Sequence, residues 1–391
     1  MKVRLVHITQ FLEIGGLESL IVELCRKLCK ENYEISVLCL DGYDENYKEA
    51  LERHSINVTL IKKNNRFDLK FFMKAAEYLK RKETDIVHSH GGCFFYSSII
   101  GRLAGVRGLI HTIHGMPISS GRQENVEEFL SCLMTDRIVA VSDQIAGDIA
   151  TRRKHFSGKI ETIINGIDPD KFSPVADTSE ISFLKESHGL PLTKKLIGTV
   201  GRLDPVKNYP LLLKAVAELT YTYGNDVHLV FVGSGSEEPL LTQMTGELGI
   251  DDRVSFLGTQ YNVHRLYPLF DIFVLSSITE GTSLALLEAQ SCGIPAVVTD
   301  VGGNSRIIRN GVNGILCPSG DHDIMAANID LLLSSEAKHG KMGKAARETI
   351  LENFSIDAML AEYKRLYGSL LREDVVSSCQ KKMDFYGISK S

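Results

Sequence analysis

The chain has 391 residues, and a soft prior of roughly 150 residues per domain predicts two or three domains. Hydrophobic residues make up 43% and charged residues 24%, which excludes a wholly disordered chain. The 44 Lys and Arg residues against 49 Asp and Glu residues give a net charge of −5, so a strongly basic nucleic-acid-binding protein is not expected.

The N-terminal segment and the cysteines indicate the compartment. The apolar stretch after Met1 is interrupted by His7, Gln10 and Glu13, which is unlike a signal peptide. No run approaches the roughly 20 apolar residues of a membrane-spanning helix. The eight cysteines are scattered without a C-x-x-C pair, which is typical of buried thiols in a reducing compartment. We therefore expect a cytoplasmic, soluble protein.

The first 164 residues alternate between short β-branched runs and amphipathic segments. The predicted strands are Val3–Ile8, Ile35–Leu40, Ile86–His88, Leu109–Thr112, Arg137–Val141 and Ile160–Ile164. The predicted helices are Leu17–Lys30, Leu69–Lys82, Cys93–Ala104 and Asp143–Arg153. The strands are continuously apolar rather than alternating, which indicates a parallel sheet covered on both faces.

A polar, proline-containing stretch then separates this series from a second one. The second set of predicted strands is Leu196–Val200, Val227–Val232, Val254–Phe256, Ile272–Leu275, Ala296–Thr299 and Ile315–Cys317. The second set of predicted helices is Tyr209–Thr222, Pro239–Leu248, Ser283–Cys292 and Asp323–Ser334. This alternation predicts two Rossmann-like, doubly wound α/β domains that face each other across a cleft at the carboxyl ends of their strands.

The expected organisation has five parts. The parts are a first domain over 1–168, a linker over 169–193, a second domain over 194–354, a helix over 355–372 and a tail over 373–391. We expect the helix to pack back on the first domain and the polar tail to be loose.

Two glycine-containing loops follow predicted strands. Gly15 and Gly16 precede the first helix, where backbone N–H groups favour an anion. Gly233 lies in a similar loop after Val227–Val232 and suits phosphate or base binding. Neither loop has the G-x-G-x-x-G dinucleotide fingerprint, so an NAD-linked oxidoreductase is disfavoured. A plain turn remains the alternative at both positions.

Cations and carboxylates follow other strands of the second domain. Arg202 and Lys207 leave one strand end together, and two cations there suit a diphosphate, although solvated surface cations fit the spacing equally. Glu280 and Glu288 flank a predicted helix start at Thr282, Ser283 and Leu284. Their spacing of about 12 Å is too long for an acid–nucleophile pair and suits the two ends of an elongated ligand such as a nucleotide sugar.

Histidine pairs end two strands of the first domain. His88 and His90 end one strand, and His111 and His114 end the next. They suggest a zinc site, but no Cys or carboxylate stands nearby at ligand spacing. We therefore expect no metal, and interpret the histidines as a polar lining of the cleft.

These residues resemble glycosyltransferase family 4, whose fold is the two-domain GT-B architecture. The resemblance covers residues 1–370 and rests on the order and spacing of several motifs. The motifs are Gly15-Gly16, His114, Asn165-Gly166-Ile167-Asp168, Gly201-Arg202-Leu203 with Lys207, the E-x7-E of Glu280 to Glu288, Asp300-Val301-Gly302-Gly303 and Asn313-Gly314. Two departures stand out: Arg306 occupies a position where the family commonly has Glu, and Asn208 replaces a frequent Gly.

The resemblance implies a role for each motif residue. The first domain would take the acceptor and the second the nucleotide sugar. Arg202, Lys207, Glu280 and His114 would be catalytic, and Gly15, Gly16, Gly233, Thr282, Ser283, Leu284 and Glu288 would bind the donor. The reaction would retain anomeric configuration without a metal or other cofactor, and stabilisation of the departing diphosphate would dominate catalysis.

The expected function is transfer of a hexose or N-acetylhexosamine from a nucleoside-diphosphate sugar to a glycan or lipid-linked acceptor in surface polysaccharide or glycoconjugate synthesis. A UDP-sugar is favoured and a GDP-sugar possible. The alternatives are a sugar-nucleotide 2-epimerase and a non-catalytic nucleotide-sugar-binding protein. Peripheral contact with the inner face of the plasma membrane is a further hypothesis, because three basic clusters lie in the first domain. They are Lys62-Lys63-Asn64-Asn65-Arg66, Lys80-Arg81-Lys82 and Arg152-Arg153-Lys154.

Overall fold

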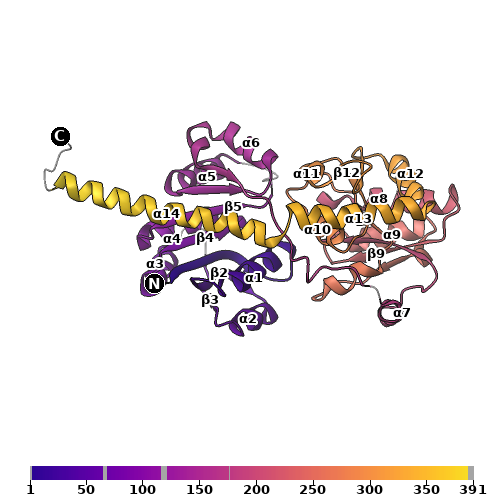
Figure 1. Cartoon of the computed structure of the whole chain (residues 1–391), viewed down its shortest axis with the longest axis horizontal. Coiled ribbons are helices and arrows are strands. Elements are labelled where there is room, and N and C mark those ends of the chain that lie inside the picture. The colour runs from indigo at the N-terminus through magenta and orange to yellow at the C-terminus, as the bar shows by residue number, and fades with distance from the viewer. Residues whose placement is uncertain (1, 65–67, 116–120, 176, 386–391) are drawn as a thin grey trace. The chain divides into compact units, whose positions relative to one another are not determined.

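The computed structural model describes residues 2–64, 68–115, 121–175 and 177–385, with side chains up to Arg372. The chain forms two compact units (Figure 1). Unit 1 comprises Met1–Ile164 and Met359–Ser391, and unit 2 comprises Asn165–Ala358. Each unit therefore has its own sheet and its own core.

Unit 1 is built on a parallel sheet with the strand order β3-β2-β1-β4-β5-β6-β7. The strands in its described residues are β1 (Val3–Leu12), β2 (Tyr33–Tyr43), β3 (Asn57–Leu60), β4 (Ile86–His90), β5 (Gly108–Ile113), β6 (Arg137–Ala140) and β7 (Ile160–Thr162). All residues of β4 are buried, as expected for a central strand covered on both faces.

Helices cover this sheet and close its core. They are α1 (Gly16–Leu28), α2 (Glu45–Glu52), α3 (Leu69–Arg81), α4 (Phe94–Ala104), α5 (Arg122–Met134), α6 (Asp143–Arg152) and α14 (Ile356–Phe385). One buried cluster joins Val6 and Ile8 of β1 to Phe71 and Leu79 of α3. The apolar stripe of α3 is thus buried against the sheet.

Unit 2 repeats the plan with the strand order β10-β9-β8-β11-β12-β13, again parallel. Its strands are β8 (Lys195–Val200), β9 (Val227–Val232), β10 (Val254–Phe256), β11 (Ile272–Leu275), β12 (Ala296–Thr299) and β13 (Ile315–Cys317). Its helices are α7 (Thr178–Ser187), α8 (Tyr209–Tyr221), α9 (Glu238–Glu247), α10 (Leu284–Ser291), α11 (Asn304–Ile307), α12 (His322–Leu333) and α13 (Glu336–Asn353).

Both sheets reverse their strand order at one point. The reversal falls between β1 and β4 in unit 1 and between β8 and β11 in unit 2. In open parallel sheets, ligands bind outside the carboxyl ends of the strands at such a switch point. The prediction of two doubly wound α/β domains is confirmed, and these two edges are where a ligand site is expected.

The structure differs from the expected organisation in several segments. Five elements other than α7 were not predicted: β3, α2, α5, α11 and α13. The stretch interpreted as a linker, 169–193, contains α7, which begins at Thr178. The capping residue Asp177 accepts the backbone N–H of Ser179 on its side chain at 2.8 Å. The segment 373–391, expected to be a loose tail, continues α14 as far as Phe385. The short helices α2 and α7 escape detection because their stabilisation comes from capping and packing more than from periodicity.

The boundary between the units also lies earlier than Asp168. The backbone N–H of Ile167 donates to Phe354 O, and that of Ile356 donates to Ile167 O, at 2.9 and 2.8 Å. These bonds tie Asn165–Asp168 to the end of unit 2. The later part of α14 belongs to unit 1, where Tyr367 contacts β4 and Leu370 contacts the start of β5.

Candidate functional site

The carboxyl edge of the unit 2 sheet gathers four loops. After β8 the chain makes a short 3-10 turn over Pro205–Lys207, and after β11 it leads into α10. The backbone N–H of Ile278 donates to Val206 O at 2.8 Å, and Ser276 Oγ donates to Lys207 O at 2.8 Å. These bonds fasten the β8 loop to the β11 loop across the switch point.

Lys207 and Glu280 meet where those two loops join. Lys207 Nζ lies 2.7 Å from Glu280 Oε1, and the side chains are 18% and 10% exposed. Ser277 Oγ donates to the same oxygen at 2.6 Å. Lys207 and Glu280 form an ion pair that is largely shielded from solvent. Electrostatic interactions are stronger there than in water. The structure thus brings together two candidate residues that were predicted separately.

Glycines allow the neighbouring loops to pack backbone against backbone. A Cβ atom on Gly233 would lie 2.0 Å from Gly201 O, and one on Gly302 would lie 1.8 Å from Glu280 O. Both positions also have positive φ angles, of 132° and 57°. The backbone N–H of Gly303 donates to Gly281 O at 2.9 Å. The loops after β8, β9, β11 and β12 consequently form one interlocked edge, and Gly233 supports it as a packing residue.

The start of α10 lies beside Glu280. Ser283 caps the helix by accepting the backbone N–H of Leu286 on its Oγ at 3.3 Å. The N–H groups of Leu284 and Ala285 belong to the first turn, which has no acceptor within the helix. The region expected to hold a phosphate therefore has the required form, with Thr282 and Ser283 largely buried ahead of the helix.

Glu288 is buried one turn from the end of α10 and accepts a short hydrogen bond from Tyr267 OH. Burial raises its pKa to about 7, although the Tyr267 hydrogen bond and the charge of Lys171 act in the opposite direction. Tyr267 is a partner that the sequence analysis missed. Little in the sequence indicated Tyr267, because this tyrosine lies before β11 outside any recognised motif.

Arg202 lies apart from the Lys207–Glu280 pair. Its side chain is 82% exposed, and Nη2 lies 3.2 Å from Asp204 Oδ2. Arg202 therefore extends into solvent, and the action of both cations on a diphosphate stays a prediction. Arg306, the family departure, is exposed on α11.

At the carboxyl edge of unit 1, Gly15 and Gly16 begin α1, as expected. The backbone N–H of Ser19 donates to Gly15 O at 2.9 Å, which forms the first turn. A Cβ atom on Gly15 would meet the carboxylate end of Glu18 at 2.3 Å, a group that can move aside. This edge is thus less tightly packed than the edge of unit 2.

Histidines dominate the centre of the unit 1 edge. His7 Nδ1 lies 2.9 Å from His90 Nε2, and His90 Nδ1 lies 3.3 Å from His114 Nε2. His88 contacts Thr112 Oγ1 through Nε2 and Tyr367 OH through Nδ1, each at 2.7 Å. Burial lowers the pKa of His7 and of His114 to about 3, so both rings are neutral at physiological pH.

His7 was not among the candidate residues of the sequence analysis. Parallel pairing of β1 with β4 places His7 opposite His88. Because alternate residues of a strand share a face, His90 lies on the same face as His88. His7 could have been identified from its place within a predicted strand, if the register of that strand against β4 had been known.

Three of these histidines are close enough to share a metal ion. The ring nitrogens offered by His7, His88 and His90 lie within 4.8 Å of one another. Both nitrogens of His88 and both of His90 have hydrogen-bond partners, and only neutral groups surround them in the described residues. The arrangement fits a hydrogen-bonded network better than a cation site, which would require these bonds to break.

Known proteins match the chain over nearly its whole length. Residues 14–171 match the family described as Glycosyltransferase Family 4, and residues 180–349 match the family described as Glycosyl transferases group 1. The chain belongs to glycosyltransferase family 4. The prediction of the family is therefore confirmed, and the fold is GT-B.

Two curated relatives of this glycosyltransferase cover almost the full chain. It is 28% identical to the N-acetyl-alpha-D-glucosaminyl L-malate synthase of Bacillus anthracis, over 96% of this chain and 99% of that protein. It is 27% identical to the UDP-Gal:alpha-D-GlcNAc-diphosphoundecaprenol alpha-1,3-galactosyltransferase of Escherichia coli, over 94% and 97%. Among solved structures, Anabaena HepE in complex with UDP and glucose superposes with a TM-score of 0.84 at 21% identity, over 94% of this chain and all of that one.

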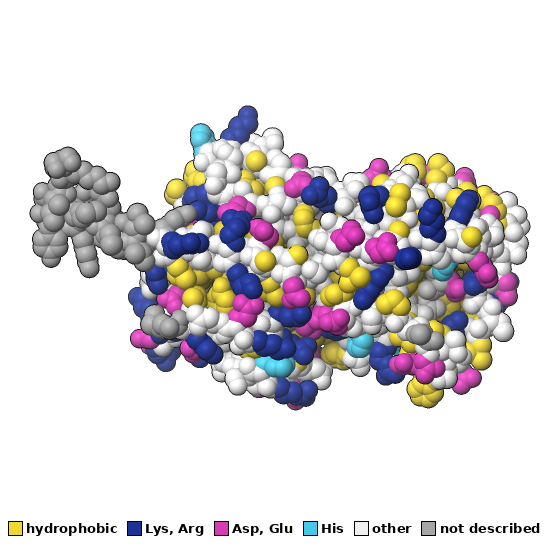
Figure 2. All heavy atoms as spheres, viewed as in Figure 1, with side chains coloured by type: hydrophobic (Ala, Val, Ile, Leu, Met, Phe, Trp, Pro, Cys, Tyr) yellow, Lys and Arg dark blue, Asp and Glu magenta, His cyan; other side chains and the backbone are white. Residues whose placement is uncertain are grey.

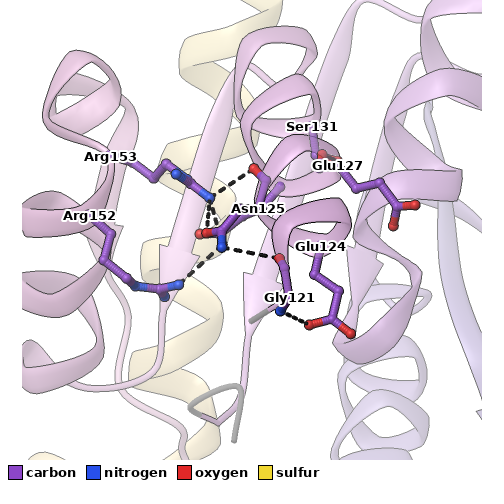
Figure 3. Close-up of polar contacts among 8 residues, drawn as sticks. Gly121, Glu124, Asn125, Glu127, Ser131, Arg152 and Arg153 are labelled. Carbon is purple, nitrogen blue, oxygen red and sulfur yellow. Dashed lines mark hydrogen bonds and ion pairs between the residues drawn. The ribbon is translucent and has the colours of Figure 1, made fainter. Parts of the chain in front are cut away.

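The basic clusters of the glycosyltransferase are partly neutralised within unit 1. Figure 3 shows Arg152 and Arg153, at the end of α6, reaching toward Asn125 of α5. Both also donate to the Glu128 carboxylate at 3.1 Å. Arg153 also donates to the Asn125 side chain at 3.1 Å. Lys63 pairs with Asp41, and Asn65 and Arg66 lie outside the described residues.

On the face visible in Figure 2, basic and acidic side chains are interspersed. Among the described residues, no helix combines the length and apolar character needed to cross a bilayer.

A hollow of about 320 Å³ lies at the other end of the unit 2 sheet. Lys195, Asp271 and His339 are among its lining residues. Lys195 begins β8 and Asp271 precedes β11, so this hollow is at the amino edge. It is therefore distinct from the loops that gather Lys207 and Glu280.

Proposed function

We propose that this glycosyltransferase moves a hexose or N-acetylhexosamine from a UDP-sugar to a glycan or lipid-linked acceptor, with retention of anomeric configuration and without a metal. The observation that carries the proposal is the Lys207–Glu280 pair at the switch point, beside the start of α10. A cation, unpaired N–H groups and a carboxylate suit a diphosphate joined to a hydroxyl-rich sugar.

In the proposed reaction, the bond between the anomeric carbon and the diphosphate oxygen breaks, and a bond from the acceptor oxygen to that carbon forms. The acceptor proton passes to the departing phosphate. Lys207 stabilises the negative charge that develops on the diphosphate, together with the N-terminal end of α10. Glu280 accepts hydrogen bonds from sugar hydroxyls, and Glu288 and Arg202 contact the donor as the family resemblance implies.

The names of the relatives support the donor and acceptor classes. The Escherichia coli relative is named for a UDP-sugar donor and a lipid-linked acceptor, and HepE binds UDP and glucose. We extend these classes to this chain as a proposal, with a GDP-sugar as the second donor to be tested. We place the reaction in the cytoplasm, in surface polysaccharide or glycoconjugate synthesis.

The test incubates the full chain with a panel of UDP- and GDP-sugars, with and without lipid extracts, and identifies the products by mass spectrometry. Release of the nucleoside diphosphate with a glycosylated product is expected, in the presence of EDTA. Interconversion of the donor without an acceptor would instead indicate a 2-epimerase. Binding without turnover of any donor would indicate a non-catalytic protein. Either outcome would overturn the proposal.

A matched pair of variants locates the activity. Lys207→Met is expected to lower kcat by about 10²- to 10³-fold, because it removes a group that stabilises charge in the transition state. Lys195→Met makes the same chemical change at the opposite edge, where Lys195 pairs with Asp271 at 2.9 Å. The control should keep the activity of the natural protein, and thermal melting of both variants checks that they fold. Equal activity of the two variants would contradict the assignment.

We also propose peripheral membrane contact through the basic side chains of unit 1. Among them, Lys154 is exposed near the end of α6. Binding to vesicles that contain anionic lipid should weaken as salt is raised. Binding that is equal for neutral and anionic vesicles, or absent from both, would contradict this part of the proposal.

A further inference from the structure

A chain of hydrogen-bonded rings leads from the buried strand β1 to the edge of unit 1. It contains His7, His90 and His114, joined through His7 Nδ1···His90 Nε2 at 2.9 Å and His90 Nδ1···His114 Nε2 at 3.3 Å. The His7 and His90 rings are nearly parallel, with an interplanar angle of 15°. His7 and His90 are buried, and His114 is half-buried at the end of the chain.

The number of ring protons limits which nitrogen can donate in each of these two hydrogen bonds. Burial and the neighbouring histidines keep the pKa of His90 well below its ordinary value, so its ring carries one proton. Because both nitrogens of His90 contact another ring nitrogen, His90 donates in one contact and accepts in the other. The chain therefore has two directions. Either His7 donates to His90 and His90 to His114, or the reverse.

The inner end of the chain distinguishes these directions. His7 Nε2 is buried and has no hydrogen-bond partner in the described structure. In the reverse direction this nitrogen would carry a proton with no acceptor. In the forward direction it keeps a lone pair with no donor. In native proteins, a buried N–H group without an acceptor is rarer than a buried acceptor without a donor. The arrangement in which His7 donates to His90, and His90 to His114, is therefore favoured.

We propose that His7 and His90 are positioning residues that hold His114 as the neutral tautomer protonated on Nδ1, so that His114 donates a hydrogen bond from Nδ1 to an oxygen of the bound saccharide. In this arrangement His114 Nε2 accepts from His90, and the single proton of His114 faces away from the chain. This inference rests on the proposed function, because it gives His114 a saccharide to contact.

Holding one tautomer has a chemical consequence. A free neutral imidazole can place either a donor or an acceptor toward a ligand, and the hydrogen bond at its other nitrogen decides which. A saccharide oxygen that accepts a hydrogen bond from the protein needs a donor opposite it. The chain supplies that donor without a full charge, which suits a neutral edge where a buried imidazolium would be costly.

Two variants at His7 separate this role from a merely structural one. In His7→Asn, the side-chain amide lies near the position of Nδ1 and retains a donor toward His90. His7→Leu removes the donor but suits the apolar strand better. We expect His7→Leu to lower kcat by about 10- to 100-fold with unchanged KM for the donor, the range seen when an outer hydrogen-bond partner is lost. We expect His7→Asn to stay within about threefold of the natural protein.

A structural role for His7 predicts the opposite order, because an Asn buried in a strand costs more stability than a Leu. Greater activity in His7→Leu than in His7→Asn would therefore overturn the proposal. His228 of β9 provides a control in unit 2, where its Nε2 contacts Ser255 Oγ at 2.8 Å and takes no part in the ring chain. His228→Leu should keep the kcat of the natural protein.

The tautomer itself can be observed without turnover. NMR of the full-length protein labelled with 15N-histidine reports which ring nitrogen is protonated, and the spectrum of His114→Gln assigns the His114 signals. The proposal expects His114 protonated on Nδ1 in the natural protein and in His7→Asn, with a shift toward Nε2 protonation in His7→Leu. Nε2 protonation in the natural protein, or no change in His7→Leu, would overturn it.

These readouts keep the inference separate from the proposed function. If no sugar is transferred, the NMR result still decides the tautomer, and if the tautomer is wrong, the transfer activity stands. Metal analysis of the purified protein adds one further outcome. One equivalent of zinc that His7→Leu loses would show that the ring nitrogens are ligands, and would overturn the hydrogen-bonded chain.

Discussion

The two units of this glycosyltransferase share a strand order but differ in the chemistry of their carboxyl edges. In unit 2 that edge carries the Lys207–Glu280 ion pair, and in unit 1 it carries neutral histidines joined through their rings. The fold places loops at the same edge in both cases. The difference shows that side-chain type, rather than topology, gives one edge charged groups and the other neutral ones.

The units also differ in how tightly these edges are packed, and glycine substitutions test this difference with the largest expected effect. Gly233→Ala should destabilise the protein by about 3 kcal/mol or more, because its Cβ would meet Gly201 O at 2.0 Å and its φ is 132°. Gly15→Ala should cost about 1 kcal/mol, since Ala caps a helix less well than Gly and Glu18 can move aside. Chemical denaturation measures both changes, and equal losses would remove the contrast.

The response of unit 2 to pH depends on its buried acid, Glu288. Its folded-state pKa of about 7 exceeds the ordinary value of 4.5, so the folded protein holds this proton more tightly than the unfolded chain. The stability it contributes is complete below about pH 4.5 and is lost as the pH rises through about 7.

Glu288→Gln removes this titration. Relative to the natural protein, the variant should gain about 3 kcal/mol of stability between pH 4.5 and pH 8. Thermal melting of both proteins across this range measures the difference. A constant difference in Tm at all pH values would show that Glu288 is not held in its protonated form.

Substitution of Arg202 has the smallest expected effect on stability, and it separates the role of Arg202 from that of Lys207. Because its side chain is 82% exposed, Arg202→Gln should change stability by less than about 0.5 kcal/mol. The family resemblance nevertheless implies a contact with the donor diphosphate, so UDP-sugar turnover should fall. Unchanged turnover would leave Lys207 as the cation that carries the reaction.

The fold was largely readable from the sequence because apolar runs and amphipathic segments alternate with little ambiguity. Strands such as Val227–Val232 were predicted with the bounds that the structure has. Helix α7 was missed because Thr178–Ser187 is short and lies in a polar stretch with prolines on both sides. Its identification depends on a cap at Asp177 and on contacts with distant residues, which periodicity does not report.

The candidate site was predictable where the backbone fixes a side chain. Lys207 and Glu280 follow adjacent strands, so their meeting follows from the strand order. Arg202 has the same sequence context as Lys207, but its long side chain has several rotamers, and the structure directs it to solvent. His7 was missed because its partners depend on the register of β1 against β4, which the sequence pattern alone does not set.

The most direct test of the central claim measures UDP binding by isothermal titration calorimetry to the natural protein, Lys207→Met and His7→Leu. The account predicts tight binding to the natural protein, similar binding to His7→Leu, and a loss of at least about tenfold in affinity for Lys207→Met, since one charged contact is worth more than about 1.4 kcal/mol. Equal affinity of all three proteins for UDP would contradict the assignment of the diphosphate to the charged edge of unit 2.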